Sequence, residues 1–314
     1  MTKNLDTRRI GIFLAFAFGI TWATSLVIYL TGGLIDSPLI FEEVGVTLAL
    51  LLMVGPVMLA PALANMLTRL VTGEGWQHAR LRPRLKRTWR TWIIAWFGPG
   101  LLTIGGAVVF FLLFPRYYDP TLSMVQDMLE TSAPSEFNLE ETNLWLLVGA
   151  QILQAMLIAP VVNGLATFGE EFGWRAYLQP KLISLGPRRT MLIMGVIWGV
   201  WHWPFILMGH NYGADYPGAP FLGLLAMVWF CLTVGTFLGW VTIRSDSVWP
   251  AVIGHAALNG IASIGVIFMR GQPNLLLGPA PTGLIGGVGF TVVAAILLLN
   301  RRALEPALDL DQKS

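Results

Sequence analysis

The chain has 314 residues, of which 55% are hydrophobic and 12% are charged, and its mean hydropathy is +0.65. Soluble domains carry about 25% charged residues, so this composition argues against a soluble protein and indicates a polytopic membrane protein. The net charge of +2 gives no reason to expect a nucleic-acid partner, and the single cysteine, Cys231, excludes an internal disulfide and a cluster of thiol ligands.

Apolar windows of about 20 residues recur along the chain, and a helix needs this length to cross about 30 Å of hydrocarbon. They predict an all-α bundle of about eight transmembrane helices, and one integral membrane domain over residues 1–314. A β-barrel would instead show short segments of alternating polarity. In chain order, the windows are 10–31, 44–66, 92–114, 146–177, 188–208, 220–243, 248–269 and 276–299.

The first window raises the question of a signal peptide. Its apolar run is longer than the apolar region of such a peptide, and no convincing small-residue cleavage site follows it. We therefore interpret it as a retained helix.

The distribution of basic residues predicts the orientation of the bundle. Of the 20 Lys and Arg residues, only Arg116 and Arg270 fall on the predicted external side, so both termini are expected in the cytoplasm. The loop 67–91 is basic and is expected to contact anionic lipid of the bilayer. The loop 115–143 is acidic and is expected to be a solvated external connector.

Small residues and prolines inside the windows predict how the helices pack. Gly195 and Gly199, and likewise Gly235 and Gly239, are spaced four apart, which lets neighbouring helices approach closely. Four prolines are expected to kink the helices that contain them. They are Pro56, Pro61, Pro99 and Pro160.

A few polar side chains lie inside these apolar windows, where an ionisable group is costly and by default marks a functional or paired site. They are Glu170, Glu171 and Arg175 in the fourth window, His202 in the fifth, and His255 and Asn259 in the seventh. The helix rise puts Glu170, His202 and His255 about 15–21 Å from the cytoplasmic ends of their helices. One shared site at mid-membrane is therefore possible.

The spacing within each helix suggests different tasks for the two glutamates. Glu171 and Arg175 are four residues apart, so they share a helix face and can form an ion pair. Glu170 is turned about 100° away from Glu171 and is left to point into a cavity. His255 and Asn259 are also four residues apart and can aim at one point.

Several functions remain open for this set of residues. Glu170 and His202 can activate water, and His255 and Asn259 can stabilise an oxyanion, which suits peptide hydrolysis without a cofactor. Glu170, His202 and His255 can also be interpreted as ligands of a divalent metal such as zinc, although the chain has no H-E-x-x-H motif. A proton or ion pathway and purely structural hydrogen bonds between helices are further alternatives.

Three motifs resemble those of the CPBP family of intramembrane proteases, which includes the type II CAAX prenyl endopeptidases and the Abi and bacteriocin-processing proteins. The motifs are "EEFGWRAYL" at 170–178, "WGVWHWPF" at 198–205 and "GHAALNG" at 254–260. The first and third match the family patterns E-E-x-x-x-R and H-x-x-x-N. The second has Trp198 where the family usually has Phe. The segment 146–269 thus contains the core that bears the motifs.

The resemblance implies an eight-helix membrane endopeptidase with a site that faces the cytoplasm. It implies that Glu170 and His202 activate water, that His255 and Asn259 form the oxyanion pair, and that Glu171 and Arg175 support them. The expected substrate is a membrane-associated peptide or protein, and the resemblance does not imply that it is prenylated. The expected location is a bacterial or archaeal plasma membrane.

Two other functions are compatible with the same fold. One is a non-catalytic membrane protein, such as a bacteriocin-immunity or scaffold protein. The other is a proton-coupled transporter, although the sequence shows no inverted repeat of the kind that many transporters have.

Overall fold

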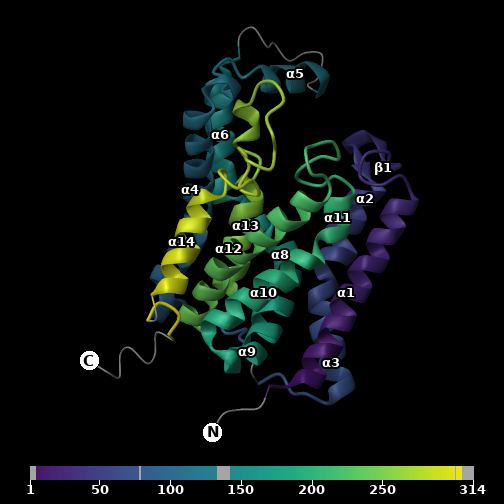
Figure 1. Ribbon diagram of the computed structural model, residues 1–314, viewed down its shortest axis with the longest axis vertical. Coiled ribbons are helices and arrows are strands. Elements are labelled where there is room, and N and C mark those ends of the chain that lie inside the picture. Colours follow the sequence, from purple (N-terminus) through teal and green to yellow (C-terminus); the bar gives the residue numbers. More distant parts are fainter. Residues whose placement is uncertain (1–4, 78, 133–141, 301, 306–314) are drawn as a thin grey trace.

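The computed structural model describes residues 5–77, 79–132, 142–300 and 302–305, which form a helical bundle with one small two-stranded sheet (Figure 1). The α-helices are α1 (Thr7–Leu30), α2 (Leu48–Leu52), α3 (Met58–Thr72), α4 (Leu85–Leu113), α5 (Ser123–Ser132), α6 (Leu144–Leu157), α7 (Ala159–Val162), α8 (Gly164–Gly173), α9 (Gln179–Leu182), α10 (Pro187–Trp201), α11 (Trp203–Leu207), α12 (Phe221–Ser245), α13 (Trp249–Ile261) and α14 (Val288–Leu299).

Short elements connect these helices. The antiparallel strands are β1 (Leu39–Phe41) and β2 (Val46–Thr47). Wider π-helical turns join α2 to α3 at Met53–Val57 and α8 to α9 at Trp174–Leu178. Single 3₁₀ turns lie at Glu42–Val44, Pro115–Tyr117, Ile183–Leu185 and Val266–Phe268.

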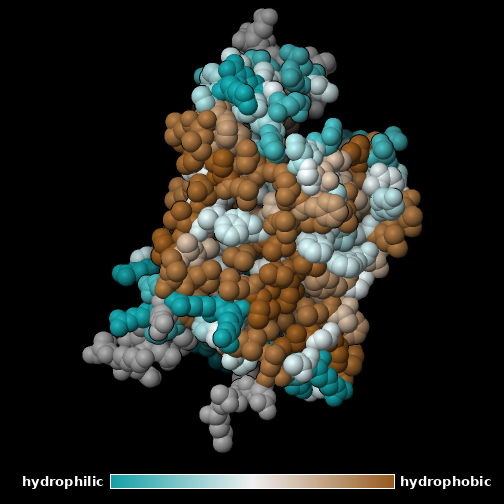
Figure 2. All heavy atoms as spheres, in the orientation of Figure 1, coloured by the Kyte–Doolittle hydropathy of each residue, from teal (hydrophilic) through white to brown (hydrophobic). Residues whose placement is uncertain are grey.

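The predicted all-α polytopic membrane fold is confirmed. Within the described residues, five helical segments are long and apolar enough to cross a membrane, judged by length and composition: Thr7–Leu30, Leu48–Thr72, Leu85–Leu113, Phe221–Ser245 and Trp249–Phe268. Two further apolar helices, α6 and α14, are shorter. Apolar side chains cover the middle of the face shown in Figure 2, and hydrophilic ones gather at its two ends.

The other three predicted spans are not continuous helices. The window 146–177 is divided into α6, α7 and α8, with breaks at Ile158 and Asn163, just before and after the helix that contains Pro160. The window 188–208 is broken at His202, two residues before Pro204, whose nitrogen cannot donate a helical hydrogen bond. In the window 276–299 only α14 is helical, and its 12 residues extend about 18 Å.

The helices that carry the predicted site, α8, α10 and α13, pack against α3 and α12. α8 packs against α3 on one side and α13 on the other, while α12 packs against α10, α13 and α14 (Figure 1). Glycines allow α10 to approach α12 closely, since a Cβ on Gly195 would lie 2.5 Å from Leu232 Cα and one on Gly199 would lie 2.5 Å from Val228 Cα. The predicted close approach at Gly195 and Gly199 is therefore confirmed, and it joins α10 to α12.

Ion pairs hold the end of the bundle where α1 begins and α14 ends (Figure 1). Glu74, just beyond α3, accepts from Lys181 of α9 at 2.9 Å and lies 3.5 Å from Arg9 of α1. Asp246, after α12, pairs with Arg80 and Arg84 of the basic loop. Three basic residues used to predict orientation, Lys3, Arg301 and Lys313, lie outside the described residues, as does 133–141 of the acidic loop.

Candidate active site

The two neighbouring glutamates of α8 contact different partners. Glu171 is fully buried, and its Oε1 lies 2.9 Å from Nη1 of Arg175 and 2.8 Å from Nδ1 of His255. The pairing of Glu171 with Arg175 that the four-residue spacing predicts is confirmed, although a π-helical turn begins between the two residues. Because a carboxylate oxygen only accepts hydrogen bonds, we assign the proton on His255 to Nδ1.

Glu170 turns toward α10 instead. Its Oε2 accepts a hydrogen bond of 2.9 Å from the indole Nε1 of Trp198, and both side chains are buried. Among the described residues, the other carboxylate oxygen of Glu170 has no hydrogen-bond partner. One oxygen of Glu170 is thus held by the protein, and the other is available to a water molecule or a substrate.

His202 lies at the break between α10 and α11. Its Nδ1 is 2.8 Å from the main-chain oxygen of Trp198 and 3.7 Å from Sγ of Cys231 on α12. A carbonyl oxygen only accepts, so Nδ1 carries a proton and the Nε2 of a neutral ring keeps its lone pair. This tautomer can take up a proton at Nε2. Cys231 is fully buried and packs in the hydrophobic core, as expected from its apolar surroundings in the sequence.

The indole of Trp198 connects the residues that sequence analysis singled out. Its ring contacts the imidazoles of His202 and His255 edge to face, with centroid separations of 5.6 and 5.3 Å. The guanidinium carbon of Arg175 lies 4.6 Å from the centroid of the same ring. The predicted meeting of the fourth, fifth and seventh windows therefore occurs at Trp198. The second motif identifies Trp198 only as an aromatic exchange and does not predict its hydrogen bond to Glu170.

Asn259 is placed differently from the other predicted residues. It lies one turn beyond His255 on α13, and its side chain is exposed, whereas His255 is buried. Within the described part of the chain it makes no hydrogen bond. The structure thus brings Glu170, Glu171, Arg175, His202 and His255 together and leaves Asn259 on the outer part of the same helix.

The side chains do not form a ready metal site. Among the described residues, no three His, Cys, Asp or Glu side chains lie close enough together to hold an ion. The Nδ1 atoms of both histidines have hydrogen-bond partners, so only their Nε2 atoms could ligate an ion, and one oxygen of Glu170 is bound to Trp198. We therefore derive no step through a metal ion.

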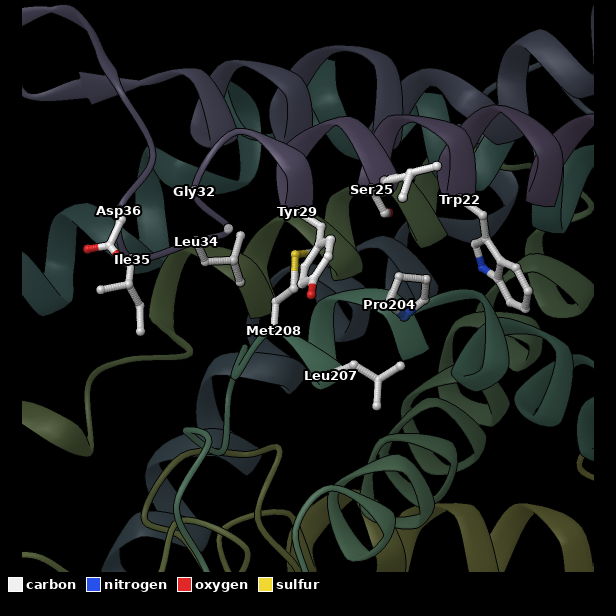
Figure 3. Close-up of a pocket in the computed structure, with 12 residues that line it drawn as sticks. Trp22, Ser25, Tyr29, Gly32, Leu34, Ile35, Asp36, Pro204, Leu207 and Met208 are labelled. Carbon is white, nitrogen blue, oxygen red and sulfur yellow. The ribbon is translucent and has the colours of Figure 1, made fainter.

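Two cavities in the described part of the chain do not include these side chains. The larger, about 640 Å³, lies between α1 and α11, and Trp22, Tyr29, Asp36, Pro204 and Leu207 contribute to its wall (Figure 3). The second, about 260 Å³, is apolar and lies between α4, α6 and the turns that follow α13. Glu170, His202 and His255 line neither of them, so neither is the cavity that Glu170 is expected to face.

Close packing against α3 fixes the position of α8. A Cβ on Gly173 would lie 2.4 Å from the main-chain oxygen of Pro61, and one on Gly169 would lie 2.4 Å from that of Met58. The amide of Asn65 donates to the main-chain oxygen of Phe172 at 2.9 Å. These contacts hold both sides of the segment that carries the two glutamates.

Comparison with known proteins agrees with the motifs. Residues 144–261, from α6 to the end of α13, match the family described as "Type II CAAX prenyl endopeptidase Rce1-like". All three motifs lie inside this segment. A search of curated proteins finds no match to the chain.

Proposed function

Because residues 144–261 match the CAAX protease-like family, we propose that the chain hydrolyses a peptide bond of a membrane-associated protein or peptide. The family is one of membrane endopeptidases, and the chain is an integral membrane protein. The observation that carries the proposal is the arrangement of Glu170, His202 and His255 around Trp198 on three helices.

Glu170 is the proposed general base. Its oxygen without a hydrogen-bond partner accepts a proton from water as that water attacks the scissile carbonyl, while Trp198 holds the other oxygen. His202 assists at Nε2, where its lone pair can accept a proton or orient the water. The proton taken from water is then delivered to the nitrogen of the leaving amine, which breaks the peptide bond.

His255 and Asn259 are the proposed donors to the oxyanion that forms at the scissile carbonyl. The carboxylate of Glu171 holds Nδ1 of His255, which leaves Nε2 as the ring nitrogen that would face the oxyanion and, when it carries a proton, donate to it. The side-chain amide of Asn259 is a donor in any protonation state. Glu171 and Arg175 act by holding His255 in place.

We propose that the reaction needs no metal ion. The support is geometric, because the three candidate ligands do not converge within the described residues. Activity is expected to persist in the presence of a chelator such as EDTA. Loss of activity with the chelator and recovery with zinc would favour the alternative, in which Glu170, His202 and His255 rearrange around a divalent ion.

We also propose that both termini are cytoplasmic. The start of α1, the end of α14 and the ion pairs around Glu74 and Asp246 lie at one end of the bundle (Figure 1). The basic loop lies at the same end, which is the cytoplasmic end by the positive-inside rule. A cysteine placed at either terminus should react with membrane-impermeant thiol reagents only after the cytoplasmic side is opened.

The decisive experiment measures cleavage of quenched peptides by the purified protein in lipid nanodiscs. Glu170→Gln and His202→Ala should abolish cleavage. His255→Asn should abolish it as well, because Asn can keep a hydrogen bond to Glu171 but lacks Nε2. Glu43→Gln, at an exposed glutamate far along the chain from the motifs, is the matched control and should cleave normally. Cleavage by Glu170→Gln at the wild-type rate would overturn the proposal.

The same variants address the two other functions. A bacteriocin-protection or partner-binding phenotype that survives Glu170→Gln would point to a non-catalytic protein. Proton-coupled uptake into liposomes that is lost in Glu170→Gln would point to a transporter. Comparing membrane proteomes of cells that express the wild-type protein or Glu170→Ala would reveal an uncut precursor, and hence the natural substrate and whether it is prenylated.

A further inference from the structure

Trp198 is the residue through which the parts of the candidate site touch. Its indole Nε1 donates to Glu170, and its main-chain oxygen accepts from Nδ1 of His202. Its ring contacts the imidazole of His255. Trp198 on α10 therefore contacts the proposed base, Glu170, on α8 and the proposed oxyanion donor, His255, on α13. It also contacts His202, four residues after itself, which is proposed to assist the base.

Of these contacts, the hydrogen bond to Glu170 has the clearest chemical consequence, because it fixes the orientation of the carboxylate. A carboxylate buried among apolar side chains can swing between rotamers, and only a fixed one presents a defined oxygen to water. Trp198 has a single N–H, directed at Oε2, and its own ring is 3% exposed. The other oxygen of Glu170 therefore has a fixed direction as well.

Packing leaves the indole little freedom to move. The guanidinium of Arg175 lies over its ring, and Arg175 is itself bound to Glu171. Close packing of α10 on α12 at Gly195 and Gly199 fixes the helix that carries it. The donor to Glu170 is therefore held from both sides, as preorganisation of a catalytic group requires.

We propose that Trp198 is a positioning residue, whose indole N–H fixes Glu170 in the orientation that accepts the proton of the attacking water. This inference rests on the proposed function. It also gives a role to the position where this chain departs from the family's usual Phe, since a phenyl ring can fill the space but cannot donate the hydrogen bond.

Trp198→Phe tests the proposal because it keeps an aromatic ring and removes only the N–H and part of the ring. We expect kcat to fall about tenfold with KM unchanged within about twofold, because the lost contact orients the base and does not bind substrate. Trp201→Phe is the control for the hydrogen bond to Glu170 alone, because the ring of Trp201 also contacts the imidazole of His202 at 4.7 Å. Trp201 lies on the same helix, is also buried, and donates its N–H to Thr21 at 2.8 Å, away from Glu170.

A spectroscopic measurement tests the hydrogen bond without any substrate. The infrared band of the Glu170 carboxylate, assigned as the band lost in Glu170→Gln, should shift in Trp198→Phe and stay in place in Trp201→Phe. If Trp198→Phe does not fold, the same hydrogen bond can be followed through the indole N–H of Trp198 in a protein with Glu170 changed. One of the 13 indole N–H signals of ¹⁵N-Trp protein should then move strongly in Glu170→Gln.

The outcomes separate this inference from the proposed function. If Glu170→Gln is inactive while Trp198→Phe has the wild-type kcat and an unshifted carboxylate band, the role of Trp198 is overturned and the protease proposal stands. If Glu170→Gln cleaves normally, the protease proposal falls and so does the positioning role. An indole signal that does not respond to Glu170→Gln would likewise overturn the inference.

Discussion

Nδ1 of His255 lies 2.8 Å from Oε1 of Glu171, a residue 84 positions earlier in the chain. The same carboxylate oxygen accepts from Arg175 at 2.9 Å. All three side chains are buried, so this contact joins α8, the turn that follows it and α13 by charge inside an apolar bundle. Glu171 therefore serves both the stability of the bundle and the orientation of His255.

Glu171→Gln is expected to destabilise the protein strongly. The change removes the charge that compensates Arg175, which is 1% exposed, and breaking a buried pair in this way costs about 3–5 kcal/mol. Thermal unfolding in detergent, followed by circular dichroism, measures the effect. The control is Arg84→Gln, which breaks a pair with Asp246 whose side chains are 36% and 41% exposed and should cost at most about 1 kcal/mol.

Equal melting temperatures for Glu171→Gln and Arg84→Gln would contradict this account. A further check is the activity of Glu171→Gln below its melting temperature, where folded protein remains. It should be reduced, because His255 loses the acceptor that holds its ring.

Local contacts at the site were predictable from sequence, and long-range ones were not. The pairing of Glu171 with Arg175 follows from helix geometry alone, because residues four apart share a face. The bonds from Glu170 to Trp198 and from Glu171 to His255 span 28 and 84 residues. They depend on how three helices rotate against each other, and the apolar windows contain no information about that rotation.

Apart from the kink expected at Pro160, the breaks in the helices escaped prediction for a different reason. A hydropathy window measures how apolar a segment is, and it responds equally to a continuous helix and to an apolar turn. The segment before α14 is rich in glycine and proline, and it folds into turns in which a Cβ on Gly286 would lie 2.0 Å from the main-chain oxygen of Ala280. Glycine and proline favour irregular backbone, but the hydropathy of this segment predicted a longer span.

Gly199→Ala is expected to disturb the site through packing. The new Cβ would meet Val228 Cα at 2.5 Å, so α10 and α12 must move apart, which typically costs about 1–3 kcal/mol. His202 follows three residues later and should lose its alignment. Gly19→Ala in α1 is the control, since a Cβ there meets nothing within 4 Å and alanine favours the helix. Melting temperature and cleavage rate should both fall in the first variant only, and a Gly199→Ala protein as stable and active as Gly19→Ala would refute the packing argument.

Asp119→Asn is expected to loosen the segment around α5. Asp119 accepts hydrogen bonds from the main-chain nitrogens and hydroxyls of Thr121 and Ser123, with distances of 2.5–2.9 Å. Burial acts to raise the pKa of this carboxyl, but the four hydrogen bonds outweigh burial and hold the pKa well below its usual range. Since Asn can replace only part of this network, the free energy of unfolding of this segment should fall by about 1.5–3 kcal/mol.

The pH dependence of that segment follows from the same shift. The pKa of Asp119 in the folded protein lies below its unfolded value of about 3.9. Asp119 therefore contributes fully to the stability of this segment above about pH 4, and this contribution is lost as the pH falls through the folded pKa. Amide hydrogen exchange of residues 121–126 measures the opening at neutral pH. Asp127→Asn, at an exposed position of α5, is the control. Identical exchange in the two variants would contradict the role of Asp119.

Asn259→Ala separates a chemical role from a structural one. The side chain of Asn259 is exposed and makes no hydrogen bond among the described residues, so its removal should leave the melting temperature unchanged. If its amide stabilises the oxyanion, kcat should fall about 10²–10³-fold, the usual cost of one such donor. Asn163→Ala is the comparison for a structural role, because the amide of Asn163 donates to the main-chain oxygen of Ala256 at 3.4 Å, beside His255. That variant should lose stability. Wild-type kcat in Asn259→Ala would remove Asn259 from the mechanism and leave His255 as the proposed donor.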